Sequence, residues 1–392
     1  MKAKSKNTKI TAAILAVSMF QMAMVALAPV VSAMTDAFPG VTDLAVQLAT
    51  TFLNLVLVIV ALLAGRIAKV IGRRMMAVIG MGLFVLTAFL GRFCSTALWT
   101  VYVWSGLLGA GTGLFVPAVA SMMLIFYEEE ERQVVAGLQT SFVNLGGVVL
   151  SLVSGWLAAK LWSNAYLTFA LAIPALIMSL RFMPGIEAER EKEHTESGEA
   201  GKRLPARVWL AALQTCVFAV CYFAYSTNIS YLLGEKGFDP TAMAGVATAC
   251  FMLGGVVCGV LLAKTMKIFR GFTPALAFIL VALSYVVLFS AKNIVVLCAA
   301  SVVGGGSLSF IFPYLVLTVG GSVEPAQSVA ATSMIISVAP NLGSFISPVI
   351  ITNLAAVLFG DAASCRFLFA AILAVLLAGV LIAAQLVKKK KA

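Results

Sequence analysis

Five polar or aromatic residues recur at helical spacing within the apolar stretch 208–232. They stand 7, 4, 3 and 3 residues apart, so they share one face of a helix: Gln214, Cys221, Tyr225, Asn228 and Tyr231. Amides and phenols that faced lipid would leave hydrogen bonds unmade, so this face must meet other helices or a wet cavity. Neutral donors, acceptors and rings of this kind suit the binding of a small organic solute.

Other apolar stretches carry further candidate binding residues. These are Gln21, Gln47, Asn54, Trp104, Asn144, Phe310, Tyr314 and Asn341. The aromatic rings would hold an apolar ring or an organic cation, although packing inside the protein explains them equally well. Asn144 and Asn341, each followed by Leu-Gly, are also candidates for hydrogen bonds between helices.

The sequence offers few groups for catalysis or metal binding. Its one histidine, His194, lies in a hydrophilic stretch, the seven cysteines form no C-x-x-C pair, and no Asp or Glu falls in the middle of an apolar stretch. An enzyme site needs a nucleophile with a base, or a metal cluster. We therefore expect no enzyme, no cofactor and no metal site. Asp36 is the one carboxylate we consider for proton coupling, against the simpler interpretation of a solvated helix end.

Composition indicates which elements position these residues. The 392 residues are 61% hydrophobic and 11% charged, whereas soluble proteins are about 25% charged. Apolar stretches of about 20 residues must cross the bilayer as helices. Twelve candidate spans cover 10–32, 44–64, 75–92, 99–123, 134–157, 165–181, 208–232, 242–263, 273–291, 294–318, 329–352 and 366–387. We expect the first to be a retained helix rather than a cleaved signal peptide.

The positive charges predict the orientation. If the N-terminus is cytoplasmic, most of the 27 Lys and Arg residues fall on the cytoplasmic side. The positive-inside rule therefore favours both termini in the cytoplasm, in a multi-pass protein of the cytoplasmic (inner) membrane. The net charge of +11 then reflects contact with the lipid bilayer, and we expect no nucleic-acid partner.

The chain also contains an internal repeat at a shift of 196 to 197 residues. Pro117 matches Pro313, Glu128 matches Glu324, and "NLG" at 144–146 matches "NLG" at 341–343. A hydrophilic stretch lies between the copies. We therefore predict an all-α membrane protein of twelve transmembrane helices: an N-terminal six-helix bundle over 1–182, a cytoplasmic linker over 183–207 and a C-terminal six-helix bundle over 208–392. This pseudo-symmetric architecture is typical of transporters with a site between their halves.

The stretch "GRIAKVIGRR" at 65–74 resembles the loop signature of the major facilitator superfamily. Gly65, Gly72, Arg73 and Arg74 fit that signature, while Lys69 stands where the family has Asp. "EEEERQVVAGL" at 128–138, through Arg132, is similar to the family's entry into helix 5. The resemblance implies that residues 65–74 form a loop that latches the two halves in one conformational state. Because Lys69 reverses the sign of the acid, we hypothesise that Glu128 to Glu131 supply the negative charge.

The resemblance and the repeat together predict a secondary active or facilitative transporter of a small organic solute that works by alternating access, as a monomer. Uptake or exchange is favoured because Gly146-Gly147 stands where proton-coupled drug exporters of the family usually carry Gly-Pro. A proton-coupled drug or metabolite efflux antiporter is the alternative. A non-transporting membrane receptor or scaffold is a more remote one. The chain lacks the G-x-x-x-x-G-K-[ST] motif of nucleotide-driven pumps.

Overall fold

The computed structural model describes residues 2–185, 204–320 and 331–391, and every regular element among them is a helix. The chain divides into two compact units. Unit 1 comprises residues 1–27 and 49–199, and unit 2 comprises residues 28–48 and 200–392. Residues 28–48, which the sequence placed in the N-terminal bundle, thus pack with the C-terminal half of the chain.

Unit 1 contains long helices joined by short turns. They are α1 (Lys2–Ser18), α3 (Asp43–Phe93, whose first turns belong to unit 2), α4 (Leu98–Phe126), α5 (Glu129–Ala158) and α6 (Ala172–Phe182), which a 3₁₀ segment at Trp162–Leu171 precedes. α1 packs against α5 and α6. α1 ends at Ser18 because the chain continues in short 3₁₀ turns, and helix resumes in unit 2 as α2 (Val31–Ala37).

Helix α3 covers two predicted spans and the predicted loop between them. Its 51 residues are far more than the roughly 20 that cross a bilayer. The backbone leaves helical geometry inside it at Gly72, where φ is 77° and ψ is 158°. Glycine adopts a positive φ without steric cost, so Gly72 bends the chain there. The prediction of a loop over 65–74 was therefore wrong: long cationic side chains are good helix formers, and helix continues up to the bend.

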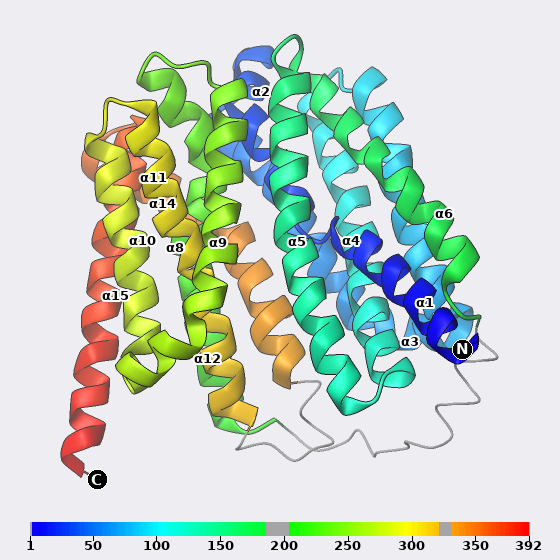
Figure 1. Cartoon of the computed structure of the whole chain (residues 1–392). Helices are drawn as coiled ribbons and strands as arrows, with labels where there is room; N and C mark the ends of the chain where they lie inside the picture. Colours follow the sequence, from blue (N-terminus) through cyan, green and yellow to red (C-terminus); the bar gives the residue numbers. More distant parts are fainter. Residues whose placement is uncertain (1, 186–203, 321–330, 392) are drawn as a thin grey trace. The chain divides into compact units, whose positions relative to one another are not determined.

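Unit 2 contains the remaining helices (Figure 1), of which α8, α15 and α9 are the longest among the described residues, with 30, 29 and 28 residues. They are α8 (Ala206–Glu235), α9 (Ala242–Phe269), α10 (Thr273–Ser290), α11 (Ile294–Gly306), α12 (Leu308–Gly320), α14 (Ala339–Phe359) and α15 (Ala363–Lys391). α14 packs along α8, α15 along α10, and α11 along α9. The predicted span 294–318 is split at Ser307 into α11 and α12.

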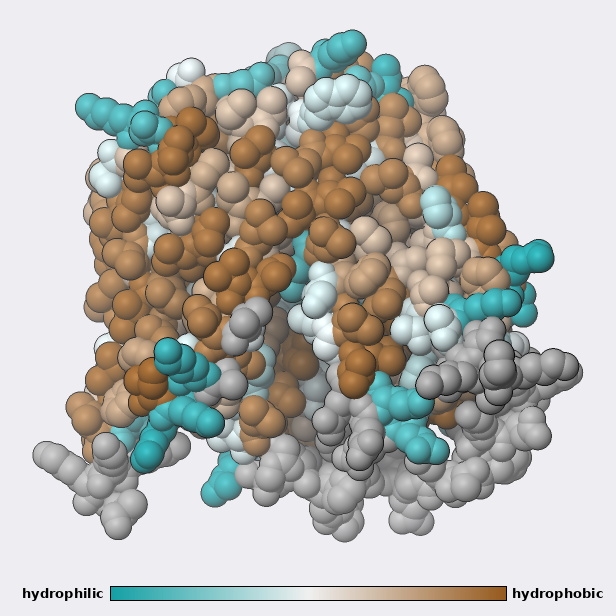
Figure 2. All heavy atoms as spheres, viewed as in Figure 1, coloured by the Kyte–Doolittle hydropathy of each residue, from teal (hydrophilic) through white to brown (hydrophobic). Residues whose placement is uncertain are grey.

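Helix length and apolarity make this a multi-pass membrane protein. Within the described residues, 10 helices are long and apolar enough to cross a membrane, or up to 11 if the bent pair Thr8–Ser18 and Ala23–Ala37 is one span. The twelve separate helices of the prediction are therefore not confirmed. Apolar side chains cover most of the helix faces in Figure 2, and hydrophilic ones gather near the helix ends. Lipid tails would solvate such faces, whose exposed side chains include Val357, Trp156 and Leu62.

The repeated "NLG" motif makes the same contact in each unit. A Cβ on Gly146 would overlap the backbone of Met19, and a Cβ on Gly343 would overlap the backbone of Cys216. Glycine thus lets α5 approach the end of α1 in unit 1 and lets α14 approach α8 in unit 2, as small residues do in membrane bundles. The internal repeat seen in the sequence is a repeat of helix packing.

Candidate functional site

A buried arginine is the centre of a polar network in unit 2. Arg366, in the first turn of α15, has a side chain that is 4% exposed and forms an ion pair with Asp43 at 2.5 Å. Its Nη2 also donates to the Asp361 carbonyl at 3.0 Å, and its Nη1 donates to Asn228 Oδ1 at 3.3 Å. The guanidinium lies over the Tyr231 ring, 5.3 Å from the centroid. A charge this far from water is stable only with such partners.

Gln47 extends the network to a fourth helix, α14. Its Nε2 donates to Asn228 Oδ1 at 3.0 Å and to the Thr227 carbonyl at 3.3 Å. Its Oε1 accepts from the Thr352 hydroxyl on α14 at 2.6 Å. Asn228 in turn donates to the Ala224 carbonyl at 2.9 Å. Gln47 and Asn228 are wholly buried, so these bonds replace those that water would otherwise make.

Tyr231 joins helix α2 to the same network. Its hydroxyl lies 2.5 Å from Thr35 Oγ1, and nearby the Ser32 N–H donates to Ser230 Oγ at 3.2 Å. Residues from α2 and from the start of α3 are thus fastened to α8, α14 and α15 by side-chain hydrogen bonds and one ion pair. The arrangement binds the ends of these helices together, so it can hold or release a conformation.

Three of the predicted binding residues, Gln47, Asn228 and Tyr231, therefore meet in one place. Arg366, Asp43, Thr35 and Thr352 are partners that sequence reasoning missed. Two of them carry a weak sequence signal, since Asp43 and Arg366 are opposite charges in the first turns of two apolar helices. Charges at helix ends are usually solvated, and the two lie 323 residues apart. Asp36, the carboxylate that we considered for proton coupling, is exposed.

Tyr225, by contrast, lies in the packed interior of unit 2. It is fully buried, its ring stacks on Phe251 with centroids 4.0 Å apart, and its hydroxyl lies 2.8 Å from Ser301 Oγ. Every polar and apolar surface of this side chain is therefore already in use by neighbouring helices. Contact between Tyr225 and a solute stays a prediction. In the structure, the side chain packs against neighbouring helices.

Two asparagines and a tryptophan among the remaining predicted residues differ in their hydrogen bonding. Asn144 and Asn341 each donate to a carbonyl four residues earlier, of Thr140 at 2.9 Å and of Ser337 at 2.6 Å. Within the part of the chain that the structure describes, neither amide bonds to a second helix, so the predicted hydrogen bonds between helices are not seen there. Trp104 is 9% exposed, and its Nε1 is buried without a hydrogen-bond partner among the described residues. An orphaned donor of this kind is available to a ligand or a water molecule.

The other five candidates differ in how deeply their side chains are buried. Asn54 is buried in unit 1 and directs its Nδ2 toward the sulfur of Met24 at 3.0 Å. Phe310 is buried, whereas three side chains are only partly so: Gln21, Gln214 and Tyr314. The structure thus does not bring all twelve predicted residues together. They divide between the two units, with Gln21, Asn54, Trp104 and Asn144 in unit 1 and the others in unit 2.

Sequence comparison identifies the family. The family model of the Major Facilitator Superfamily matches residues 11–348. The chain belongs to this superfamily. Membership makes it a membrane transport protein rather than an enzyme. No curated protein matches the sequence closely enough to count as a relative.

Solved structures of other transporters share the fold of this superfamily member. A point mutant of the nucleoside transporter NupG superimposes with a TM-score of 0.75 at 12% identity, over 96% of this chain and 99% of that one. A D-xylose-proton symporter has a TM-score of 0.73 at 13% identity, over 95% and 97% of the two chains. A peptide transporter solved with sulfate has a TM-score of 0.70 at 12% identity, over 96% and 94%. At these identities the likeness shows the fold alone.

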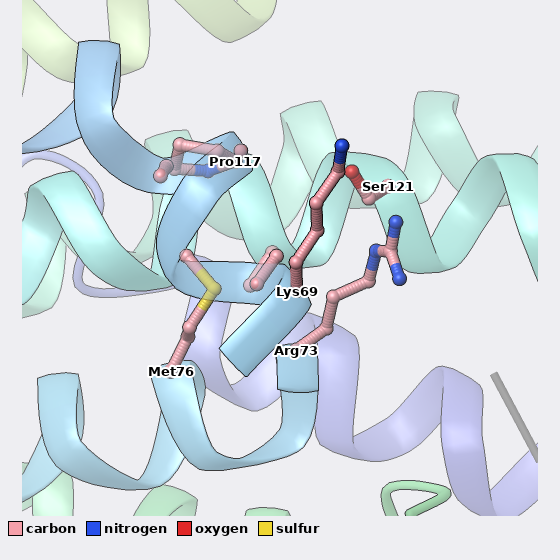
Figure 3. Close-up of a pocket in the computed structure, with 9 residues that line it drawn as sticks. Lys69, Arg73, Met76, Pro117 and Ser121 are labelled. Carbon is pink, nitrogen blue, oxygen red and sulfur yellow. The ribbon is translucent and has the colours of Figure 1, made fainter. Parts of the chain in front are cut away.

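The superfamily signature lies in unit 1. Gly72 supplies the bend in α3, Arg74 Nη2 donates to the Leu180 carbonyl near the end of α6, and Gly65 and Lys69 are exposed. Lys69, Arg73 and Ser121 line a small cavity beside this bend, of about 100 Å³ (Figure 3). Glu128 and Glu131 are exposed as well, and no ion pair joins either of them to Lys69. The side chains of Glu129 and Glu130 lie outside the described residues, and Arg132 is half-buried, with its backbone N–H donating to the Glu128 carbonyl at 2.8 Å. The hypothesis that these glutamates complete the latch stays a prediction.

Proposed function

We propose that this transporter moves a small organic solute by alternating access, and that the Asp43–Arg366 network is the contact that fastens residues 28–48 to α8, α14 and α15 in one state. The observation that carries the proposal is the burial of Arg366 in a network of partners that come from separate helices. In the other state these groups would separate, and water would replace their hydrogen bonds. The two states would then differ in free energy by only a few kcal/mol, as a conformational switch requires.

The proposal includes twelve membrane crossings. Helix α3 would cross the membrane twice, because it bends at Gly72. It lies in the cytoplasmic membrane with both termini inside, as the positive charges favour, and it acts as a monomer in contact with lipid. The solute contacts the predicted binding residues. Trp104 has the strongest support among them because its buried indole N–H has no partner among the residues that the structure describes. Gln47, Asn228 and Tyr231 exchange their network partners for solute when the network opens.

Uptake or exchange remains the favoured direction, because Gly146-Gly147 stands where proton-coupled drug exporters of the superfamily usually carry Gly-Pro. Proton-coupled efflux is the second candidate, and one observation favours it. The side chain of Asp43 is 32% exposed and pairs with a buried arginine, and carboxylates paired with a buried charge in membrane proteins are usual marks of an ion or proton path. The two candidates differ in their response to a pH gradient.

Flux into liposomes tests the proposal. Purified protein would be reconstituted and offered labelled nucleosides, sugars and peptides, the solutes named for the similar structures, with and without a pH gradient. We expect saturable flux of one class. Trp104→Phe, which keeps a ring but removes the N–H, should weaken binding of that solute about tenfold, because an unmade hydrogen bond costs about 1–3 kcal/mol. Trp156→Phe, at a side chain that is 75% exposed on α5, is the matched control and should not change it.

The network is tested by transport with paired variants. Asp43→Asn, Arg366→Gln and the double variant should each change the transport rate, and the two single changes should not be additive because the residues act as a pair. Asp361→Asn is the control, since Asp361 contacts Arg366 through its carbonyl and its side chain is exposed. Additive effects would remove the latch from the proposal, and absence of flux for every solute would favour a receptor or scaffold.

A further inference from the structure

Two charged residues at the end of α8, Glu235 and Lys236, bind two neighbouring helices of unit 2. The helix ends there because the backbone turns at Gly237, where φ is 79° and the N–H donates to the Gly234 carbonyl at 3.0 Å. Glycine is the residue that most often ends a helix in this way. The turn leaves the side chains of Glu235 and Lys236 at the tip of α8.

Glu235 caps the start of α15. One of its carboxylate oxygens accepts from the Ser364 hydroxyl at 2.5 Å, and the other accepts from the Ser364 N–H at 3.0 Å. The first N–H groups of a helix have no partner within the helix, and a negative charge beside them is stabilising. Arg366 lies two residues further along the same turn. The bonds to Ser364 therefore fix the backbone from which the Arg366 side chain extends.

Lys236 makes the opposite contact with α10. Its ammonium donates to the carbonyls of Phe289 at 2.9 Å and Ala291 at 2.8 Å, where α10 ends. A positive charge is stabilising at this end of a helix. Since α10 packs along α15 (Figure 1), the tip of α8 holds the end of one helix and the start of its neighbour.

The other contacts of Arg366 also tie it to α8. Its Nη1 donates to Asn228, and its guanidinium lies over the Tyr231 ring, both on α8. Asp43 is the partner of Arg366 that comes from residues 28–48, and its side chain is 32% exposed. When these elements part, Arg366 can keep its partners on α8 while water hydrates Asp43, so the buried charge is not left alone.

We propose that Glu235 is a positioning residue for the Asp43–Arg366 contact. By capping α15 it holds Arg366 beside Asn228 and Tyr231, so that the network opens between Arg366 and Asp43. The inference rests on the proposed function, because the contact must open for the role to matter. It divides the network into a part that stays together, α8 with α15, and a part that leaves, residues 28–48.

Amide hydrogen exchange of the full chain in detergent tests this role without a solute. Glu235→Ala removes both accepting oxygens and should speed exchange over residues 363–368 about fivefold, the usual value of a lost helix cap. Because the cap positions Arg366, exchange should also speed over residues 43–48, at the start of a different helix. Glu235→Gln keeps one accepting oxygen and should show a smaller change at both places. It carries the same test if Glu235→Ala does not fold.

Two further variants separate positioning from simple capping. Lys236→Ala is the matched control: it removes the neighbouring contact at the tip of α8, so it should speed exchange at the end of α10 and leave residues 43–48 unchanged. In an Arg366→Gln background, Glu235→Ala should no longer affect residues 43–48, because the side chain that it positions is gone. Faster exchange confined to residues 363–368, or an equal effect of Lys236→Ala on residues 43–48, would overturn the proposal.

Asp43→Asn tests where the network opens. It should speed exchange over residues 43–48 and leave residues 363–368 unchanged, because Glu235 still holds the start of α15. An equal change at both places would contradict the division of the network.

Arg366→Gln alone distinguishes this inference from the proposed function. If it leaves exchange over residues 43–48 unchanged, the Asp43–Arg366 contact does not fasten these residues, and the proposed function and the inference fail together. If Arg366→Gln speeds that exchange and neither Glu235 variant does, the contact stands and the positioning role of Glu235 alone is overturned.

Discussion

Asp43 and Asp239 stand 196 residues apart, the shift that also relates Pro117 to Pro313, and they use their carboxylates differently. Asp43 begins α3 and forms an ion pair with Arg366 of α15 at 2.5 Å. Asp239, just before α9, accepts hydrogen bonds at 2.8 Å from the N–H and the hydroxyl of Thr241 and from the N–H of Ala242. One aspartate thus binds a distant helix, and its counterpart caps its own.

The difference shows which features of the repeat follow from packing and which are free to change. Gly146 and Gly343 make equivalent backbone contacts, since helices can approach this closely only where a side chain is absent. A carboxylate at the start of a helix has no such constraint. The backbone N–H groups there can donate to this carboxylate or to other acceptors, so the carboxylate can pair either locally or with a distant residue. The packing is shared by the two halves, and the charged contact belongs to one.

The largest expected effect comes from breaking the shared packing. Gly146→Leu and Gly343→Leu should each abolish the folded protein, because the added atoms would overlap the backbones of Met19 and Cys216. Fluorescence-detected size-exclusion chromatography of detergent extracts would measure the folded fraction. Gly82→Leu and Gly379→Leu are matched controls, since nothing lies within 4 Å of a Cβ at either position. If all four variants fold equally well, the close contacts of Gly146 and Gly343 do not contribute to the stability of the fold.

The next effect comes from the distant contact. Arg366→Ala should destabilise the protein, because loss of one partner from a buried pair costs about 3–5 kcal/mol, and less where the remaining charge can reach water. The Asp43 side chain is 32% exposed, so we expect a value below that range. Arg366→Lys should recover only part of the stability, because an ammonium cannot bond to Asp43, Asn228 and Asp361 in one plane. Thermal unfolding in detergent measures both variants, and equal melting temperatures for wild type and Arg366→Ala would contradict the prediction.

Sequence reasoning recovered the elements better than their connections. Apolar length identified almost every helix. The repeated "NLG" was expected to mark hydrogen bonds of its asparagines, whereas its glycines, Gly146 and Gly343, make the close helix contacts. Sequence reasoning missed the helical continuation up to Gly72 because a cluster of charges resembles a loop, although Lys and Arg favour helix. It also missed the Asp43–Arg366 pair, because nothing local to either residue specifies a partner 323 residues away. Residues that meet through tertiary packing carry no spacing signal.

Substitution of Asp239 tests the local contact, and we expect it to have the smallest effect on the free energy of unfolding. Asp239→Ala should cost about 0.5–2 kcal/mol, the usual value of a lost helix cap, whereas Asp239→Asn keeps the accepting oxygen and should cost less. Asp43→Asn should destabilise more than Asp239→Asn, because it leaves Arg366 buried without its anion. Similar melting temperatures for the two asparagine variants would show that both aspartates act only as local caps.

The pH dependence of the Asp239 contribution follows from its hydrogen bonds. Burial raises the pKa of Asp239, but the bonds from the Ala242 N–H and from the hydroxyl and N–H of Thr241 outweigh it, so the pKa lies below its ordinary value of 3.8. A carboxyl whose pKa is lower in the folded state stabilises the protein above the ordinary pKa, and this contribution is lost as the pH falls through the lowered value. Wild type should therefore melt higher than Asp239→Asn at pH 6, and the difference should vanish at the lowest pH at which both remain folded. A difference that stays constant as the pH falls below 3.8 would mean that Asp239 stabilises α9 through its shape and not through its charge.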